Sequence, residues 1–227
     1  MLIAVFGDIH GNLPAFEAAL GHIDAAGIQT VLNTGDAIVG YPWPNEVIDL
    51  VRSRNIPSVQ GEMDRFAVRF LRSAERLRER WTPQEFAALE WAHRETRSDH
   101  LEFLRALPKS ITVTIDGTPI FLCHGTAGSQ SEGLREIDDL GLFRRQREAA
   151  NTRLFICGQT HRPYWRWVDD TLFVNPGSLG IPPDEGAFAT YATVSTEAEP
   201  WTAEFVRVPY DMTRIEERFR ECGLERP

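Results

Sequence analysis

The sequence predicts an α/β protein, and two observations carry this prediction. Apolar runs with strand character alternate with segments of helical period, beginning with a continuously apolar run at residues 2–6 that is typical of a strand buried on both faces. Five of the predicted strand ends also carry acidic, amide or imidazole side chains. In α/β sheets such ends meet at one crevice, so the pattern indicates a shared site.

The first half of the chain predicts strands and helices in alternation. A helix is expected at 15–26, with Pro14 in its first turn, then a strand at 31–34 and a helix at 46–54 capped by Asn45. Residues 56–60 are a candidate third strand. Residues 65–107 are rich in Arg and Glu with helical period, and Thr82 is expected to cap a new helix that Pro83 opens.

The second half of the chain predicts more strands. Asp116-Gly117 indicates a hairpin of strands at 111–115 and 119–123, and Asp169-Asp170 a turn between strands at 165–168 and 172–174. A helix at 134–150 precedes a strand at 154–157. Late strands at 188–194 and 203–208 lead to a last helix at 212–222.

Composition excludes some classes of protein. The 227 residues indicate one domain, and the formal net charge of -9 disfavours non-specific binding to a nucleic-acid duplex or an anionic membrane. The N-terminus lacks the basic region of a signal peptide, and no apolar run is long enough to cross a membrane. Three widely spaced cysteines are typical of thiols in a reducing compartment, so we expect a cytoplasmic protein.

The strand ends predict a metal site. The side chains concerned are Asp8 and His10, Asp36, Glu62, His124, and Gln159 with His161. Carboxylate oxygen and imidazole nitrogen are natural ligands of divalent transition metals. A buried core histidine is the better interpretation of His124 taken alone, but the whole set favours metal binding over coincidence. The remaining histidines, His22, His93 and His100, fall in helical segments and are interpreted as packing or solvated residues.

These motifs resemble a known family. GDIH, GDAIVG, GEMD, CHG and GQTH are similar to the signature blocks of the calcineurin-like metallophosphoesterase superfamily, over residues 2 to about 210. GYPWPNEV, NPGSLG and RVPYD resemble its small bacterial branch, described as phosphodiesterase-like or diadenosine-tetraphosphatase-like. The resemblance implies two mixed β-sheets in a sandwich flanked by helices, an αββα fold with metals at the sheet edge.

We therefore expect a single domain over 1–227 with a helical insertion at about 65–107. Two interpretations of these helices stay open. They cover the rim of the site, or they only complete the outer layer.

The resemblance also assigns the ligands. The first metal ion would take Asp8, His10 and His161, and Asp36 would bridge both ions. The second ion would take Asp36, His124, Glu62 and Gln159. One or two divalent ions are expected, with manganese preferred and iron, zinc, nickel and magnesium as alternatives. The implied activity is hydrolysis of a small phosphoester by a metal-activated hydroxide, acting on a diester or nucleotide-type substrate.

Three positions depart from the family pattern. Glu62 replaces an Asn, Gln159 replaces a His, and Met63 replaces the catalytic His. Glu62 and Gln159 make the second site richer in oxygen, while Met63 cannot donate a proton to the leaving group. A degenerate protein that binds metal and a ligand or partner with little turnover is therefore the alternative, and a DNA nuclease is a weaker third.

Two arginines beside the motifs are candidate phosphate ligands. Arg65 and Arg162 could bind a phosphoryl group through their guanidinium forks, although ordinary surface arginines are the simpler interpretation. Whether the chain forms a homo-oligomer is left open.

Overall fold

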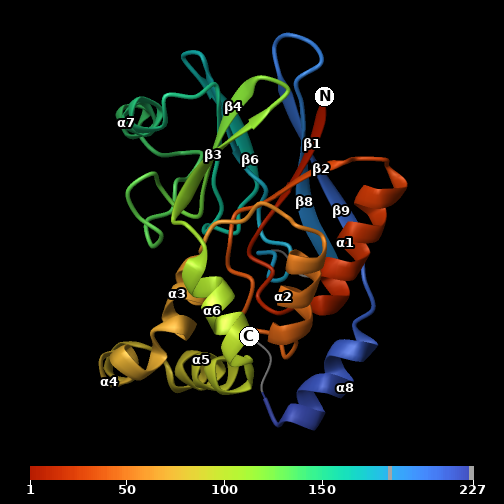
Figure 1. Cartoon of the computed structure of the whole chain (residues 1–227), viewed down its shortest axis with the longest axis vertical. Coiled ribbons are helices and arrows are strands. Elements are labelled where there is room, and N and C mark those ends of the chain that lie inside the picture. Colours follow the sequence, from red (N-terminus) through yellow and green to blue (C-terminus); the bar gives the residue numbers. More distant parts are fainter. Residues whose placement is uncertain (184–185, 225–227) are drawn as a thin grey trace.

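Two mixed β-sheets lie face to face in the computed structural model, which describes residues 1–183 and 186–224 (Figure 1). One sheet has the strand order β2-β1-β8-β9 and the other β3-β4-β5-β7-β6. The strands are β1 Leu2–Phe6, β2 Thr30–Asn33, β3 Ser110–Ile115, β4 Thr118–Cys123, β5 Leu154–Ile156, β6 Tyr164–Val168, β7 Thr171–Asn175, β8 Phe188–Ser195 and β9 Thr202–Pro209. The predicted sandwich of mixed sheets is confirmed.

Strand directions bring several carboxyl ends together. In the first sheet β1 pairs parallel with β2 and antiparallel with β8. In the second sheet β4, β5 and β7 run parallel, while β3 and β6 pair antiparallel at the edges. The loops after β1 and β2 and those after β4 and β5 therefore leave their sheets at the edge where a crevice is expected.

The core between the sheets follows from the alternation of side chains along each strand. Ile3 and Val5 of β1 point toward the second sheet and pack in one cluster with Leu154 and Ile156 of β5. Ala4 and Phe6, on the other face of β1, pack against the helical layer, and Phe155 of β5 packs with Phe143 of α7. Because both faces of these strands are buried, their sequences are continuous apolar runs.

Helices cover the outer faces of both sheets. They are α1 Leu13–Ala25, α2 Pro44–Ser53, α3 Glu62–Val68, α4 Phe70–Arg80, α5 Pro83–Glu95, α6 Ser98–Ala106, α7 Leu140–Ala150 and α8 Thr213–Cys222. Figure 1 shows α3 to α6 gathered at one end of the sandwich. Thr82 caps α5 as predicted, since its hydroxyl accepts from the Glu85 amide while the Glu85 carboxylate accepts from the Thr82 amide.

Three local predictions are wrong. Residues 56–60 form only an isolated bridge from Ser58 to Asn33, because Pro57 has no amide hydrogen to donate and the chain turns directly into α3. Asn45 lies inside α2, where its side chain binds the Glu95 carbonyl instead of capping the helix. The helix expected from residue 134 begins at Leu140, because residues 135–138 form a turn first.

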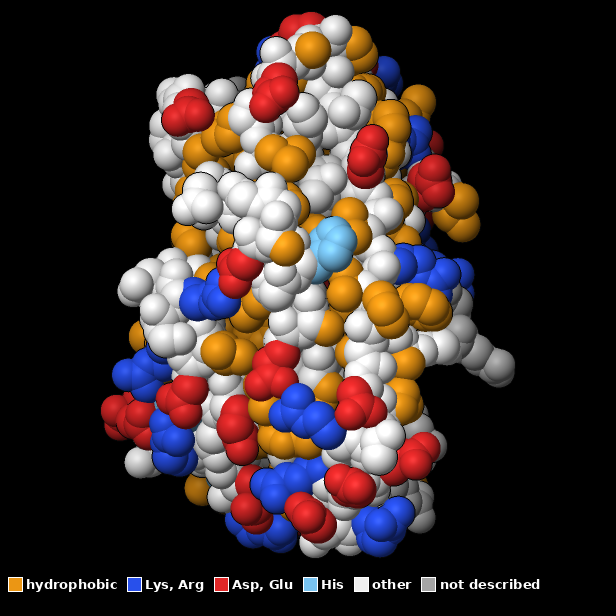
Figure 2. Space-filling model, turned by 90° about the vertical axis from the view of Figure 1, so that its right-hand side faces the viewer, with side chains coloured by type: hydrophobic (Ala, Val, Ile, Leu, Met, Phe, Trp, Pro, Cys, Tyr) orange, Lys and Arg blue, Asp and Glu red, His pale blue; other side chains and the backbone are white. Residues whose placement is uncertain are grey.

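The surface carries interspersed charge. Figure 2 shows one face on which acidic and basic side chains alternate over its lower part, while its upper part carries hydrophobic and uncharged groups with several acidic side chains among them. No helix among the described residues is long and apolar enough to cross a membrane. All three cysteines are free thiols, two of them buried.

Candidate metal centre

Four loops bring the predicted ligands together. Asp8 and His10 follow β1, Asp36 follows β2, His124 follows β4 and His161 follows β5. One group of potential ligand atoms, all within 4.8 Å of one another, comes from Asp8, His10 and His161; a second comes from Asp8, Asp36 and His124. The five side chains thus make one continuous cluster that draws on both sheets.

Backbone carbonyls fix the three imidazole rings in the same way. Nδ1 of His10 lies 2.8 Å from the Val39 carbonyl, that of His124 2.9 Å from the Thr34 carbonyl, and that of His161 3.1 Å from the Ile181 carbonyl. A carbonyl can only accept, so each Nδ1 carries the hydrogen. Each Nε2 then points to the centre of the cluster, where it can bind a metal ion once it carries no hydrogen.

The donor atoms fit a divalent cation. The Nε2 atoms of His10 and His161 face each other at 3.1 Å, and Asp8 Oδ1 lies 3.4 Å from Nε2 of His161. Asp8 Oδ1 and His124 Nε2 are buried without any hydrogen-bond partner. Buried polar atoms are normally satisfied, and a cation between these atoms would satisfy both kinds of donor.

Opposite charges interact closely within the cluster. Burial would lower the pKa of His124, but the Asp36 carboxylate 3.2 Å away raises it to about 10. For Asp36, burial favours the neutral form, yet the His124 imidazole holds the pKa of the carboxyl below its usual range. Burial and the neighbouring His161 lower the pKa of His10. The Asp36 carboxylate and the His124 imidazole therefore each favour the charged form of the other.

The loops that carry the ligands approach one another closely. A Cβ at Gly158 would lie 2.8 Å from Asp8 Oδ2, and one at Gly61 would collide with the Asp36 carboxylate. Both positions therefore exclude any larger residue, since contacts this short force the backbone apart. The glycines of GEMD and GQTH allow the loops after β1, β2 and β5 to meet.

Two predicted ligands make other contacts. The Glu62 carboxylate lies 3.4 Å from the Arg65 guanidinium and belongs to neither group of converging ligand atoms among the described residues. The Gln159 amide nitrogen lies 3.4 Å from the Ser131 carbonyl, while its backbone amide donates to Asp8 Oδ2. Both side chains border the cluster, and their role as metal ligands stays a prediction.

Asp64 holds the loop that carries Asp36 in place. Its buried carboxylate accepts from the amides of Ala37, Ile38 and Gly61, and thereby joins the loop after β2 to the start of α3. Burial, together with the nearby Asp36 carboxylate, raises the pKa of Asp64 to about 7. The neighbouring Arg65 turns away from Asp64 and donates to Glu62 and Ser131.

The loop after β7 was not assigned a role from the sequence. The Ser178 hydroxyl donates to the Asp8 carbonyl, and the Asn175 amide donates to the Gly158 carbonyl. This loop therefore holds the Asp8 loop of one sheet and the Gln159 loop of the other in place. The Asn-Pro-Gly-Ser turn after a strand was the available signal.

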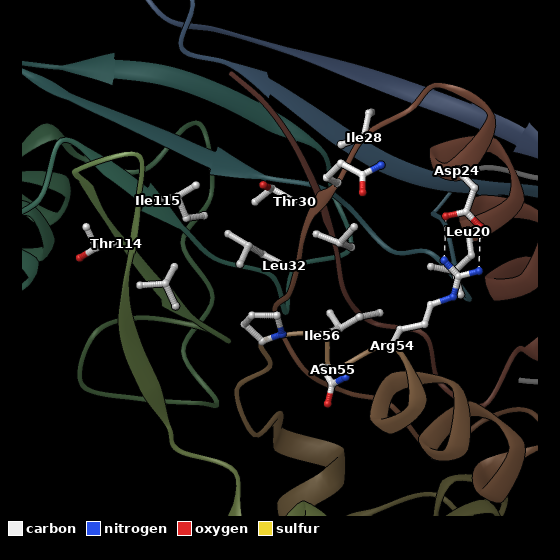
Figure 3. Close-up of a pocket in the computed structure, with 14 residues that line it drawn as sticks. Leu20, Asp24, Ile28, Thr30, Leu32, Arg54, Asn55, Ile56, Thr114 and Ile115 are labelled. Carbon is white, nitrogen blue, oxygen red and sulfur yellow. Dashed lines mark hydrogen bonds and ion pairs between the residues drawn. The ribbon is translucent and has the colours of Figure 1, made fainter.

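Two hollows border the predicted ligands, and a third does not. One of about 500 Å³ is lined by His10, Glu62 and Met63, together with side chains of α3 and α5, and one of about 700 Å³ is lined by Gln159, Arg135 and Arg162. The third, shown in Figure 3, lies along the edge strands β2 and β3 and beside the Asp24–Arg54 ion pair. None of the predicted ligands lines this third hollow, so it is not the candidate site.

Fold and site together define a class. A sandwich of two mixed sheets, with buried aspartates and histidines converging from its strand ends, is the arrangement of a metal-dependent phosphoester hydrolase. The model of the calcineurin-like phosphoesterase superfamily domain matches residues 1–199, and the chain belongs to this superfamily.

Several known proteins are similar to the chain over nearly its whole length. The chain is 28% identical to an uncharacterized protein from Methanocaldococcus jannaschii, over 96% of this chain and 91% of that protein. A solved hypothetical protein from Pyrococcus horikoshii has a TM-score of 0.84 at 23% identity, covering 99% of this chain and 94% of its own. A solved metallophosphoesterase from Sphaerobacter thermophilus has a TM-score of 0.78 at 26% identity. The match covers 99% of this chain and 95% of that one.

Proposed function

We propose that this protein hydrolyses a small phosphodiester or nucleotide-type phosphoester with the help of divalent metal ions. The convergence of Asp8, His10 and His161 with Asp36 and His124 carries the proposal. Ions bound by these residues would supply Lewis-acid activation of water and of the phosphoryl oxygens. Manganese is the proposed ion, because Asp36, Glu62 and Gln159 would give the second site mostly oxygen ligands.

The chain's own residues would hold the ions in fixed positions. Asp8, His10 and His161 would hold the first ion. Asp36 would contribute to both ions, and His124 would contribute to the second. The rings cannot rotate away, because each Nδ1 hydrogen is bound by a carbonyl. Such preorganisation limits the reorganisation that the reaction needs.

The neighbourhood of the cluster favours substrates with good leaving groups. Met63 has no proton to give, and the nearby Asp64 carboxylate is buried against three amides. A leaving group would therefore depart with little help from a general acid, which suits aryl diesters and phosphoanhydrides better than sugar monophosphates.

Arg162 is the arginine proposed to contact the substrate. Arg162 and Arg135 line the hollow beside Gln159, where a guanidinium could bind a phosphoryl oxygen. The Arg65 guanidinium contacts Glu62 and Ser131, so its direct role is weaker than that of Arg162.

The alternative function is metal and ligand binding with little turnover. It is favoured by the side chains of Glu62 and Gln159, which contact Arg65 and Ser131. A second ion would then lack two of its expected ligands.

Turnover of bis(4-nitrophenyl) phosphate by metal-free protein with added manganese separates the two functions. The proposal expects turnover that needs the metal and is lost in His10→Ala and Asp36→Asn. His22→Ala is the matched control, since His22 is an exposed histidine of α1 outside the site. Tight metal binding without turnover would favour the alternative, and unchanged turnover in His10→Ala would refute the site.

A further inference from the structure

The hollow beside His10 has a different character from the metal cluster. It holds about 500 Å³, enough for a substituent the size of an aromatic ring. Its walls come from the loops that carry His10 and Gly40, from the helices α3 and α5, and from Ile181. Because a proposed metal ligand forms part of its wall, a group attached to a phosphoryl at the cluster would reach it directly.

One wall of this hollow is apolar. Met63 and Phe66 of α3, Trp81, and Ala88 of α5 line it, and all four are only partly buried. Phe66 and Trp81 pack edge to face, with ring centroids 5.1 Å apart. Apolar surface left accessible inside a concave site gains free energy when a ligand covers it.

The hollow offers little to an anion. Its charged lining consists of Glu62 and Glu85, and no arginine or lysine lines it among the described residues. The Glu85 carboxylate is used in capping α5. Arg65 lies nearby, but its guanidinium is placed 4.6 Å from the Phe66 ring centroid and contacts Glu62. The hollow beside Gln159 contrasts with it, because Arg135 and Arg162 line that one.

We infer that the hollow beside His10 binds an uncharged, apolar, ring-sized ester substituent of the phosphodiester substrate. This inference rests on the proposed function and narrows its substrate class. It gives Met63 a role, since a thioether fills irregular apolar surface that a polar side chain would disrupt. A second phosphoryl group would not be accepted there, because it would face two carboxylates without a basic partner.

Three substrates with a common leaving group test the inference. They are the methyl, phenyl and 3-carboxyphenyl esters of 4-nitrophenyl phosphate, each releasing 4-nitrophenolate. Covering a phenyl ring should raise kcat/KM of the phenyl ester roughly tenfold or more above that of the methyl ester. The 3-carboxyphenyl ester should lose most of this preference. Equal kcat/KM for the three esters would overturn the inference.

A matched pair of variants locates the effect. Ala88→Leu fills the hollow, and the ratio of phenyl to methyl kcat/KM should fall toward one. Ala87→Leu adds the same side chain at the neighbouring, exposed position of α5 and should leave the ratio unchanged. Melting temperatures of both variants check that they fold. A ratio that stays high in folded Ala88→Leu would contradict the inference.

Binding measurements separate this inference from the proposed function. If the manganese-loaded protein turns over none of the esters, the proposed function fails, and calorimetry with phenylphosphonate and methylphosphonate then decides about the hollow. The inference expects phenylphosphonate to bind roughly tenfold more tightly, and Ala88→Leu to remove the difference. Equal binding, or no binding of either compound, would overturn it.

Discussion

Most of the proposed ligands sit on an unusual backbone. Asp8, His10, Asp36, Gln159 and His161 all have φ between 52° and 70°, in the left-handed region. Asp and His tolerate this region better than most residues, but each such position still costs roughly 1–3 kcal/mol. The cost is offset by the packing and hydrogen bonds around the loops, so these side chains are held in place before any ligand binds.

Met63 gives the first prediction at the scale of single residues. Without a proton donor there, the rate should fall steeply as the leaving-group pKa rises, and alkyl leaving groups should be roughly 10²–10⁴-fold slower than aryl ones. Met63→His should flatten this dependence, while Met63→Leu should keep it. The measurement is kcat/KM over a series of diesters. Highest activity of the natural sequence on an alkyl monoester would refute the prediction.

Glu62 and Gln159 give the second prediction. With His124 as its single imidazole, the second ion should bind weakly or exchange readily, whereas the first should bind tightly. Calorimetric titration of metal-free protein with manganese should show one tight step. The double change Glu62→Asn with Gln159→His should give two tight steps. Two matched steps in the unchanged protein would show that these residues already serve as good ligands.

At the scale of elements, Asp64 joins the loop after β2 to α3. Asp64→Ala would leave three buried amides without an acceptor and should lower the free energy of unfolding by roughly 3 kcal/mol. Metal affinity should fall as well, because Asp36 lies in the loop that Asp64 holds. Urea unfolding and manganese titration measure the two effects. Asp211→Ala, at an exposed aspartate, is the control, and equal effects of both variants would contradict this role.

The elements also show what the sequence could predict. Long apolar runs such as Leu2–Phe6 and the Asp116-Gly117 hairpin were identified correctly, because period and turn chemistry are local properties. The strand expected at 56–60 does not form. Strand pairing depends on distant parts of the chain, and the Gln60 amide donates to the Pro108 carbonyl, which lies outside any strand. The ligand types were readable, but the left-handed backbone that aims them comes from contacts between distant loops.

At the scale of the whole molecule, the cluster draws on loops that follow strands of both sheets. Asp8, His10 and Asp36 follow strands of one sheet, and His124 and His161 follow strands of the other. An ion held by both sets would therefore join the sheets. It would also reduce the repulsion between the buried carboxylates of Asp8 and Asp36.

Metal removal should accordingly destabilise the fold. Manganese at one hundred times its dissociation constant should add about 2.7 kcal/mol, which corresponds to a rise in Tm of roughly 5–10 °C for a chain of this size. Scanning calorimetry with and without chelator measures the shift. His22→Ala should keep the shift and His10→Ala should lose it. The same shift in His10→Ala would place the ion elsewhere.

Anomalous diffraction from crystals grown with manganese tests the central claim most directly. The account predicts one strong peak between Asp8, His10 and His161. A second, weaker peak beside Asp36 and His124 should lie roughly 3.5–4 Å away and grow with the manganese concentration. Absence of any peak at these five side chains, in protein shown to bind manganese in solution, would contradict the account.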